Sequence, residues 1–314
     1  MSNKRQISFT EQVRGKALAL GFDLCGFARA RRLDEYEAPF RAWCAGGMNA
    51  KMNYLCRDIE KRLNPRILFP GSETVVVTGL NYYSSQSQTQ YDTPVISRYA
   101  HGKDYHNIVA GKLGKLLEFI RTVRPEAEGK LFCDSSQIAE KPWAVQAGLG
   151  WQGRNSLVIN PVTGSFFFIG ILLVNIRFDY DEPFRDNLCG ECNRCIERCP
   201  TGAINSDRTI DARKCIANLT IESKKPVPAE MAALFEKRIY GCDICQEVCP
   251  HNKLAREHNT PEFSMTEELK NLKRAEWISL TRGQFGRLFK ESPVMRVGFE
   301  RFKKNIEIIM RSGS

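Results

Sequence analysis

Residues 189–200 read CGECNRCIERCP and decide how the middle of this 314-residue chain is built. They space four cysteines as C-x2-C-x2-C-x3-C and end in proline, a pattern typical of chains that bind two [4Fe–4S] clusters. In that pattern the first three cysteines bind one cluster and the fourth binds the other. The sequence therefore predicts a redox module in which Cys189, Cys192 and Cys195 serve one cluster and Cys199 serves a second.

A second run, YGCDICQEVCP at residues 240–250, supplies only three cysteines. By the same pattern Cys242 and Cys245 join the second cluster, and Cys249 crosses back to complete the first. One thiolate is then missing. Cys215 is the cysteine that lies between the two runs, so we assign it as the eighth ligand. Two zinc sites are the alternative, although structural zinc sites use other spacings. Four cysteines remain, and their apolar neighbours predict small buried side chains rather than ligands. They are Cys25, Cys44, Cys56 and Cys133.

The composition is that of a globular protein with a basic surface. Hydrophobic residues make up 42% of the chain, charged residues 26%, and the formal net charge is +10. Residues 251–314 hold 13 Lys and Arg against 8 Asp and Glu, so half of the positive excess lies in the last fifth of the chain. A basic surface favours a polyanionic partner, with nucleic acid as the leading candidate and a merely solvated face as the alternative.

The apolar segments indicate neither export nor a membrane anchor. The longest apolar run, FFFIGILLVNI at residues 166–176, is about half as long as a membrane helix and predicts a buried strand pair. Residues 1–16 lack the apolar stretch of a signal peptide. In such a chain, clustered cysteines favour metal binding over disulfides. We therefore expect a cytoplasmic monomer with no membrane partner.

Periodicity predicts an α+β fold in three parts. Helical patterns cover residues 9–20, 106–121 and 139–147, and strand-like runs cover residues 22–28, 74–80, 130–133, 157–159 and 166–176. We place a catalytic domain of α/β character at residues 1–180, a bacterial ferredoxin-like domain with two [4Fe–4S] clusters at 181–256, and a helical, basic C-terminal region at 257–314. Clusters transfer single electrons, so this arrangement predicts a redox enzyme whose active centre lies outside the cysteine module. A non-catalytic ferredoxin-type electron carrier is the alternative, but it leaves residues 1–180 without a purpose.

Several segments outside the first cysteine run resemble the epoxyqueuosine reductase family. They are GMNAKMNYLCRD (47–58), NPRILFPGSETVVV (64–77), SRYAHGKDYH (97–106), CDSSQIAEKPWAVQAGLGWQGRNSLVINPVTGSFFFIG (133–170), CIANLTIE (215–222) and YGCDICQEVCPHN (240–252). Within them AGLGWQGRNSL is the specific part, whereas the cysteine runs alone fit many ferredoxins. Members of this family reduce epoxyqueuosine to queuosine in the tRNA anticodon loop, the last step of queuosine biosynthesis.

The resemblance implies a particular set of cofactors and partners. It implies base-off cobalamin, with cob(II)alamin as the resting state, held between the N-terminal cobalamin-binding domain and the ferredoxin-like domain. It also implies electrons that arrive through the two [4Fe–4S] clusters from an unidentified donor, and a tRNA carrying epoxyqueuosine. The chain contains no D-x-H-x-x-G motif, which agrees with a cobalt that has no histidine ligand. A related corrinoid reductive dehalogenase acting on a small molecule is the second reading.

The resemblance marks Asp134 as the catalytic proton donor and as a cofactor contact. Removal of the epoxide oxygen as water consumes two electrons and two protons, and a carboxylic acid supplies one if burial raises its pKa. Asp134 follows the apolar stretch 130–133 and precedes a helical pattern, so helix N-cap is its alternative role. Tyr105 and its neighbour His106 are candidates for the same substrate pocket, with a structural histidine as the alternative.

The remaining site residues also come from the resemblance. Arg57 is expected to neutralise an amide carbonyl or the phosphate of the corrinoid. The other implied corrinoid contacts are Ser97, Val158, Gly170 and Ala217, for the last three of which the backbone would suffice. The candidates for phosphate contacts with tRNA are Lys141, Lys224 and Lys225, because basic side chains position a nucleic-acid backbone without reading bases. Solvent-facing lysines and packed core residues are the alternatives.

Overall fold

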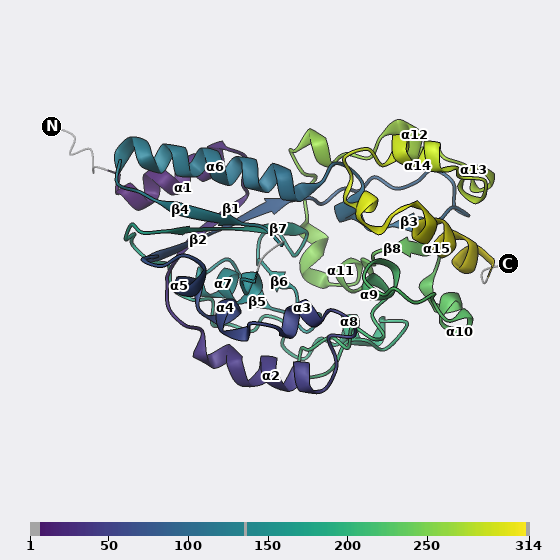
Figure 1. Cartoon of the computed structure of the whole chain (residues 1–314), viewed down its shortest axis with the longest axis horizontal. Coiled ribbons are helices and arrows are strands. Elements are labelled where there is room, and N and C mark those ends of the chain that lie inside the picture. Colours follow the sequence, from purple (N-terminus) through teal and green to yellow (C-terminus); the bar gives the residue numbers. More distant parts are fainter. Residues whose placement is uncertain (1–6, 135–136, 312–314) are drawn as a thin grey trace.

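The computed structural model describes residues 7–134 and 137–311. A four-stranded antiparallel sheet in the order β1-β2-β7-β4 lies in one half of the molecule, away from the C-terminal helices (Figure 1). The strands are β1 (Leu24–Arg29), β2 (Thr74–Asn81), β4 (Gly129–Phe132) and β7 (Phe167–Val174). Because the strands are antiparallel while helices lie between them in the chain, the fold is mixed α+β, in agreement with the sequence.

Helices cover both faces of this sheet (Figure 1). On one face lie α1 (Phe9–Ala19) and α6 (Tyr105–Val123), and on the other lies α7 (Glu140–Gln146). Alternate residues of the central strands supply the two cores because successive side chains of a strand point to opposite faces. Facing α6 are Val76, Leu80, Leu172 and Val174. Facing α7 are Val75, Val77, Ile171 and Leu173.

Local sequence explains where the long helices begin. The Ser8 hydroxyl accepts a hydrogen bond from the Glu11 backbone N–H and caps α1. The Asp104 carboxylate accepts from the His106 backbone N–H at 3.0 Å and caps α6. Both caps satisfy backbone donors that have no partner within the first helical turn. The predicted helices at residues 9–20, 106–121 and 139–147 are confirmed as α1, α6 and α7.

The prediction of a strand pair at residues 166–176 is wrong. Residues Phe167–Val174 form the single strand β7, which pairs with β2 on one side and β4 on the other. A central strand with helices over both faces has no polar side, so its sequence reads as one continuous apolar run. The strand therefore lacks the alternation of apolar and polar residues that marks a half-buried strand, and the sequence does not show whether the run forms one strand or two.

Shorter elements complete the fold. The helices are α2 (Glu37–Ala45), α3 (Asn53–Cys56), α4 (Ile59–Leu63), α5 (Pro65–Leu68), α8 (Arg194–Glu197), α9 (Ile216–Ile221), α10 (Ala229–Ala232), α11 (Ile244–Glu247), α12 (Glu267–Lys270), α13 (Arg274–Ile278), α14 (Arg282–Leu288) and α15 (Phe299–Arg311). Short 3-10 helices cover Asp34–Tyr36, Arg98–Ala100, Ala233–Phe235, Pro250–Leu254, Pro261–Phe263 and Pro293–Val297. The short strands are β3 (Val95–Ile96), β5 (Trp151–Gln152), β6 (Val158–Ile159) and β8 (Arg238–Tyr240), pairing β3 with β8 and β5 with β6.

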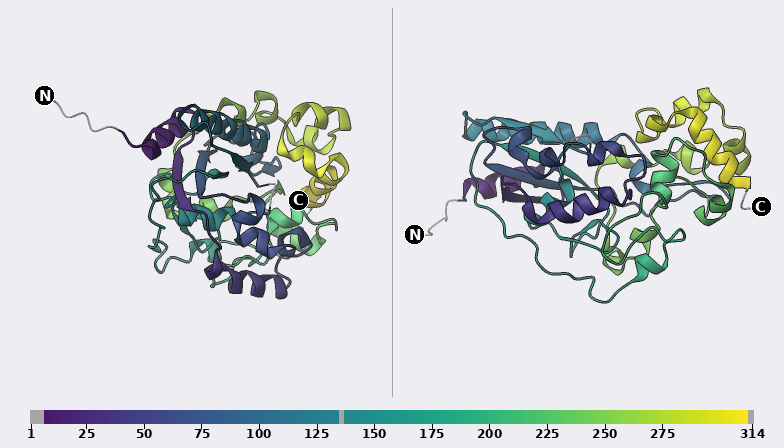
Figure 2. Two further views of the ribbon diagram at one scale, coloured as in Figure 1. Left: turned by 60° about the vertical axis from the view of Figure 1, so that its left-hand side comes forward. Right: turned by 60° about the horizontal axis from the view of Figure 1, so that its bottom comes forward.

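The C-terminal helices pack onto the cysteine module and share its core. Trp277, Phe289 and Phe302 lie in one buried cluster with Tyr240 of β8 and Ile96 of β3. The two ends of the chain therefore lie at opposite ends of the molecule, with the cysteine runs between the sheet and the C-terminal helices (Figure 1). The segment between β7 and α8 has no helix or strand over residues 178–187 and runs along the outside (Figure 2).

Within the described residues, no helix has both the length and the apolar character that crossing a bilayer requires.

Candidate active-site pocket and cluster ligands

A pocket of about 960 Å³ opens on the α7 side of the sheet. Aromatic side chains from α2 and α3 form one wall, and Asp134 together with residues 137–142 forms another. Thr209, Glu222 and Arg296, from the cysteine module and the C-terminal region, reach the same space. The pocket therefore lies where all three predicted parts of the chain meet. Its volume is at the upper end of the range of small-molecule sites, which suits a large cofactor.

Asp134 lies on the pocket wall in an unusual backbone conformation. Its φ is +51°, in the left-handed region that residues other than glycine seldom adopt. The side chain lines the pocket two residues after β4 and is 55% exposed, so the burial that the sequence led us to expect of a proton donor is not observed. The alternative role as an N-cap is not supported, because α7 begins at Glu140 and the residue before it is Ala139. Such strain persists where surrounding contacts hold it, and it clusters at functional sites.

Tyr105 of α6 holds the Asp134 carboxylate, and His106 lies beside it. The Tyr105 hydroxyl donates to Asp134 Oδ2 at 2.5 Å, and His106 Nε2 lies 3.7 Å from the same oxygen. Burial, together with the charge of Asp134, raises the pKa of Tyr105, so the phenol stays protonated and donates. The Tyr105 ring stacks on Phe168 of β7 with centroids 4.0 Å apart. Of the two residues predicted to line this pocket, His106 lies on the described lining, whereas Tyr105 lies outside it and contacts Asp134 through its hydroxyl.

Glu140, a residue that the sequence did not single out, holds the backbone of Asp134. Its Oε1 accepts a hydrogen bond from the Asp134 N–H at 2.5 Å, and its side chain lines the pocket. Burial and the charge of Asp134 raise the pKa of Glu140 to about 8. In the sequence Glu140 is an ordinary acidic residue in a helical first turn, and no spacing rule points to it.

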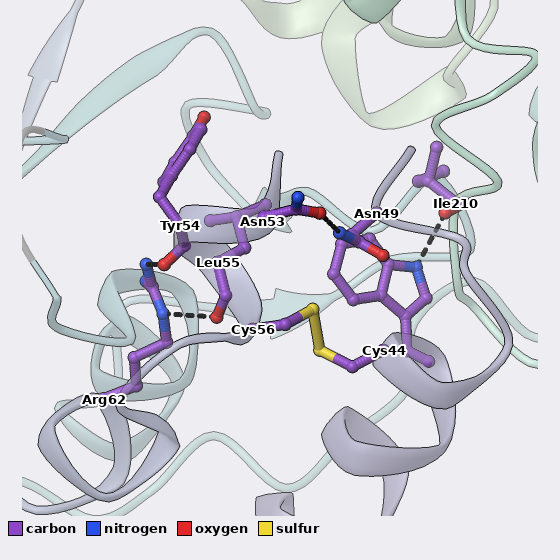
Figure 3. The surroundings of a disulfide bond; sticks show 9 residues. Cys44, Asn49, Asn53, Tyr54, Leu55, Cys56, Arg62 and Ile210 are labelled. Atoms are coloured by element: carbon purple, nitrogen blue, oxygen red, sulfur yellow. Dashed lines mark hydrogen bonds between the residues drawn. A yellow bond between two sulfur atoms is a disulfide. The ribbon is translucent and has the colours of Figure 1, made fainter. Parts of the chain in front are cut away.

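The wall made by α2 and α3 is cross-linked by a disulfide between Cys44 and Cys56 (Figure 3). The prediction that these two cysteines are small buried hydrophobes is wrong. Both are partly exposed, and their helices run close enough for the sulfurs to bond. The prediction is confirmed for Cys133, which is 4% exposed, whereas Cys25 is partly exposed but unpaired in the described chain. Periodicity carries no information on which helices meet.

Polar contacts hold the same wall against its neighbours (Figure 3). The Arg62 guanidinium donates to the backbone oxygens of Leu55 at 2.8 Å and Tyr54 at 3.0 Å. The Trp43 indole N–H donates to the Ile210 backbone oxygen at 2.8 Å, which ties α2 to the cysteine module. The residues that flank the disulfide thus line the pocket themselves.

The first set of predicted cluster ligands converges on one small pocket. Cys189, Cys192, Cys195 and Cys249 all line a space of about 20 Å³ beside the short helix α8. The Trp151 indole N–H donates to Cys189 Sγ at 3.3 Å. Cys249 comes from the other run, as the crossed pattern requires, because α8 and α11 pack against each other. Among the residues that the structure describes, no three His, Cys, Asp or Glu side chains form a group suited to a single metal ion.

Two thiols of the second set, Cys215 and Cys245, lie close enough to the pocket residue Lys141 to act on its charge. Burial raises the pKa of Cys215, and the charge of Cys199 raises it further. Burial raises the pKa of Cys242 to about 12, with a further contribution from the charge of Cys215. Burial likewise raises the pKa of Cys245, and the charges of Cys242 and Cys215 add to it. These four thiols are therefore close enough to interact electrostatically, and they ionise readily only when bound metal compensates the charge.

Four of the predicted corrinoid contacts lie outside the described pocket lining, and three of the four are packed. Ser97 is 3% exposed and donates to the Asp243 carboxylate. Val158 is buried in β6. A Cβ built on Gly170 would lie 2.7 Å from Val109 of α6, so this glycine faces the covered side of the sheet. Ala217 is partly exposed in the first turn of α9. Among the described residues of the pocket lining, none of these four is present.

The predicted basic contacts are exposed. Lys141 lines the pocket next to Glu140. Arg57 is exposed at the end of α3, outside the described lining. Lys224 and Lys225 are exposed in the segment after α9. Only Lys141 of these four is thus brought into the pocket.

Two family models match the chain. The model described as 4Fe-4S double cluster binding domain matches residues 188–252. The model described as epoxyqueuosine reductase QueG, DUF1730, matches residues 62–135. The chain thus carries a 4Fe–4S double-cluster domain, and Asp134 lies inside the second match.

Curated relatives cover almost the whole chain. The epoxyqueuosine reductase of Leadbetterella byssophila is 42% identical over 96% of this chain and 98% of its own length. That of Cyclobacterium marinum is 38% identical over 97% of this chain and 98% of its own length. That of Escherichia coli strain K12 is 35% identical, and the match spans 96% of this chain and 80% of the relative.

Solved structures agree with these relatives. An epoxyqueuosine reductase crystallised with an epoxyqueuosine-modified tRNA-Tyr stem loop matches with a TM-score of 0.89 at 27% identity, covering 96% of this chain and 81% of that one. The structure of epoxyqueuosine reductase from Streptococcus thermophilus matches with a TM-score of 0.88 at 25% identity, covering 98% and 82%. A catabolic reductive dehalogenase shares only the fold, with a TM-score of 0.50 at 16% identity over 99% of this chain and 39% of its own. The extent and identity of the full-length relatives show that this chain belongs to the epoxyqueuosine reductase family.

Proposed function

We propose that the pocket beside Asp134 is the site at which this chain works as an epoxyqueuosine reductase. As a member of that family, the chain is an oxidoreductase that reduces epoxyqueuosine in tRNA and carries a 4Fe–4S double-cluster domain. We choose this pocket because the Asp134 carboxylate lies on its wall. This carboxylate is held by Tyr105 at 2.5 Å on the wall of a cavity of about 960 Å³ that the cysteine module also borders.

The pocket suits base-off cobalamin as the cofactor. Phe40, Trp43 and Tyr54 offer an aromatic wall against which a flat macrocycle would pack. Among the described lining residues the one histidine is His106, and its Nδ1 is engaged by Asp104 at 2.6 Å. Its Nε2 lies 3.7 Å from Asp134 Oδ2, so the imidazole is placed between two carboxylates at the pocket wall. When bound, the cofactor supplies a cobalt centre that exchanges single electrons and reacts at the epoxide.

Asp134 is the proposed proton donor. Conversion of an epoxide to an alkene breaks two C–O bonds, forms one C=C bond and releases water, at a cost of two electrons and two protons. The Tyr105 hydroxyl holds the carboxyl at the pocket wall, so that it would meet the leaving oxygen in a constant position. A Bacillus subtilis epoxyqueuosine reductase, 27% identical with a TM-score of 0.86, is described with an aspartate catalytic loop swung out of its active site.

The two cysteine sets are the proposed electron path. Cys189, Cys192, Cys195 and Cys249 are assigned to one cluster, and Cys199, Cys215, Cys242 and Cys245 to the other. Support comes from the convergence of the first set on one pocket and from the electrostatic contact among the second. Cys215 and Cys245 lie close enough to Lys141 of the pocket lining to act on its charge, so the second cluster would lie nearer the proposed cofactor.

The division of the chain and its contacts with tRNA are also proposals. We assign residues 1–180 to cobalamin binding and catalysis, 181–256 to the clusters and 257–314 to the helical basic region. Lys141, exposed on the pocket wall, and the exposed pair Lys224 and Lys225 are candidates for phosphate contacts. Arg57, Ser97, Val158, Gly170 and Ala217 remain the candidate contacts of the corrinoid, through the backbone where the side chain is packed.

Anaerobic reconstitution tests the proposal. Cluster-loaded protein supplied with cobalamin, a low-potential reductant and epoxyqueuosine-containing tRNA should form queuosine, detected by nucleoside mass spectrometry. The Asp134→Asn variant should retain clusters and cobalamin yet lose roughly 100-fold or more of its turnover, the contribution typical of a general acid. Full activity in that variant would remove the proton-donor role, and no product from the loaded wild type would contradict the choice of cofactor.

A further inference from the structure

The two-proton stoichiometry leaves one proton without a source. Asp134 carries at most one, and its side chain is 55% exposed in the open pocket. The pocket lining includes a second carboxyl group in direct contact with Asp134, that of Glu140. Among the described carboxyl groups of the lining, Glu140, six residues further along the chain, is the one hydrogen-bonded to Asp134.

Glu140 is bound to the Asp134 backbone rather than to a cation. Its Oε1 accepts from the Asp134 N–H at 2.5 Å, across the turn in which Asp134 takes a φ of +51°. A carboxyl group accepts this hydrogen bond through its carbonyl oxygen in either protonation state, so a proton on the other oxygen does not disturb the turn. Within the described chain, no ion pair joins Glu140 to Lys141 or Arg62, although both line the same pocket.

The surroundings of Glu140 favour its protonated form. Desolvation by the pocket wall is the largest cause of its raised pKa, and the charge of Asp134 acts in the same direction. The Asp134 N–H, the adjacent Lys141 and the Arg62 guanidinium of α4 oppose it. Cys133, which precedes Asp134, is buried and neutral. The outcome is a carboxylic acid with a pKa of about 8, so the group holds its proton at neutral pH.

We propose that Glu140 is the second acid of the site, which stores the second proton of the epoxide reduction and returns it to Asp134 after Asp134 has protonated the leaving oxygen. This inference rests on the proposed role of Asp134. The overall step stays balanced: two electrons arrive through the clusters, one proton comes from each carboxyl group, two C–O bonds break, and the oxygen leaves as water. Solvent reprotonates Glu140 between turnovers. Glu140 is also a positioning residue, because it holds the Asp134 backbone.

The test separates the two roles of Glu140 with two variants. Glu140→Gln keeps an oxygen that accepts from the Asp134 N–H but cannot release a proton, whereas Glu140→Ala removes both functions. Glu118→Gln on α6, an exposed glutamate on the opposite side of the sheet, is the matched control. Each variant is first checked for cluster content and for binding of the epoxyqueuosine stem loop.

Single-turnover alkene formation is then measured by rapid quench across pH 6 to 10. The wild-type rate should fall as pH rises through about 8, because the stored proton is present below that pH and lost above it. Glu140→Gln should be slower by about tenfold or more at neutral pH and should lack this decline. Glu118→Gln should match the wild type.

Infrared titration of the cobalamin-free protein gives a readout that does not depend on activity. The wild type should show a protonated carboxyl band that disappears through about pH 8 and is missing in Glu140→Gln. The proposal would be overturned if Glu140→Gln kept the wild-type rate and the same fall in rate with rising pH, and only Glu140→Ala lost activity. Glu140 would then be a positioning residue alone. Absence of product from the loaded wild type would instead contradict the cofactor assignment.

Discussion

At the scale of single residues, Asp134 depends on side chains that lie far from it in the sequence. Tyr105 is 29 positions earlier, yet its hydroxyl meets the carboxylate at 2.5 Å because α6 packs across the sheet beside the end of β4. The tyrosine ring is fixed in turn by stacking on Phe168. A carboxyl in a strained turn thus has its orientation set by an aromatic stack on the sheet.

Tyr105→Phe should retain the ring stack and lose only the hydrogen bond to Asp134. A hydrogen bond to a charged group is worth about 1.5 kcal/mol or more, so single-turnover alkene formation should slow by roughly tenfold. Cluster content and the far-ultraviolet circular dichroism spectrum should not change. Tyr91→Phe, at a tyrosine that is 94% exposed, serves as the control. An unchanged rate in Tyr105→Phe would mean that the hydroxyl does not position Asp134.

At the scale of elements, α2 and α3 form one wall of the pocket although neither helix contributes a buried residue, and α3 is a single turn. Their fixed points are the Cys44–Cys56 disulfide, the Arg62 hydrogen bonds and the bond from Trp43 to Ile210. A wall with so little apolar burial depends on cross-links to keep its shape.

The double variant Cys44→Ser, Cys56→Ser should lower the free energy of unfolding. The disulfide closes a loop with a sequence separation of 12 residues, for which chain entropy predicts a loss of roughly 3 kcal/mol. Denaturant titration of oxidised wild type against the variant measures this difference. Reduction of the wild type, followed by alkylation mapping, should bring it to the stability of the variant. Equal stability of all three forms would show that the disulfide does not contribute.

At the scale of the whole molecule, the pocket is bordered by segments from every part of the chain. The sheet side, the cysteine module and the C-terminal region supply Asp134, Thr209 and Arg296, respectively. The cysteine module and the C-terminal region share a core that includes Tyr240, Trp277 and Phe302, and this core fixes their relative position. With a net charge of +10, the assembled surface favours an anionic macromolecule over a neutral one.

Binding of the epoxyqueuosine stem loop should therefore weaken steeply with salt. Replacement of Lys224 and Lys225 by alanine should lower the affinity and reduce the slope of log K against log salt by up to about 1.4, if each lysine neutralises one phosphate of a single strand. Lys115→Ala, an exposed lysine of α6 on the far side of the sheet, should leave the slope unchanged. Fluorescence anisotropy at several salt concentrations measures these slopes. Equal slopes for all three proteins would exclude the lysine pair from the interface.

Local patterns account for what could be predicted from the sequence. The boundaries of α1, α6 and α7 follow from periodicity, and the caps at Ser8 and Asp104 lie within three residues of their donors. The error at β7 arises because a strand covered on both faces loses its alternation. The error at Cys44 and Cys56 arises because a disulfide depends on which helices meet, and no periodicity records that.

The sequence by itself determined the cysteine count and the likeness to the family, and it predicted the crossed assignment of the two runs, because each depends on neighbours in the chain. Only the tertiary structure decided that Tyr105 meets Asp134, that Glu140 holds the backbone of Asp134 in a left-handed turn and that Cys44 bonds to Cys56. These contacts depend on how α6, α7 and the pocket wall pack around the sheet. Such packing is fixed by burial summed over the whole molecule, and no single stretch of sequence contains it.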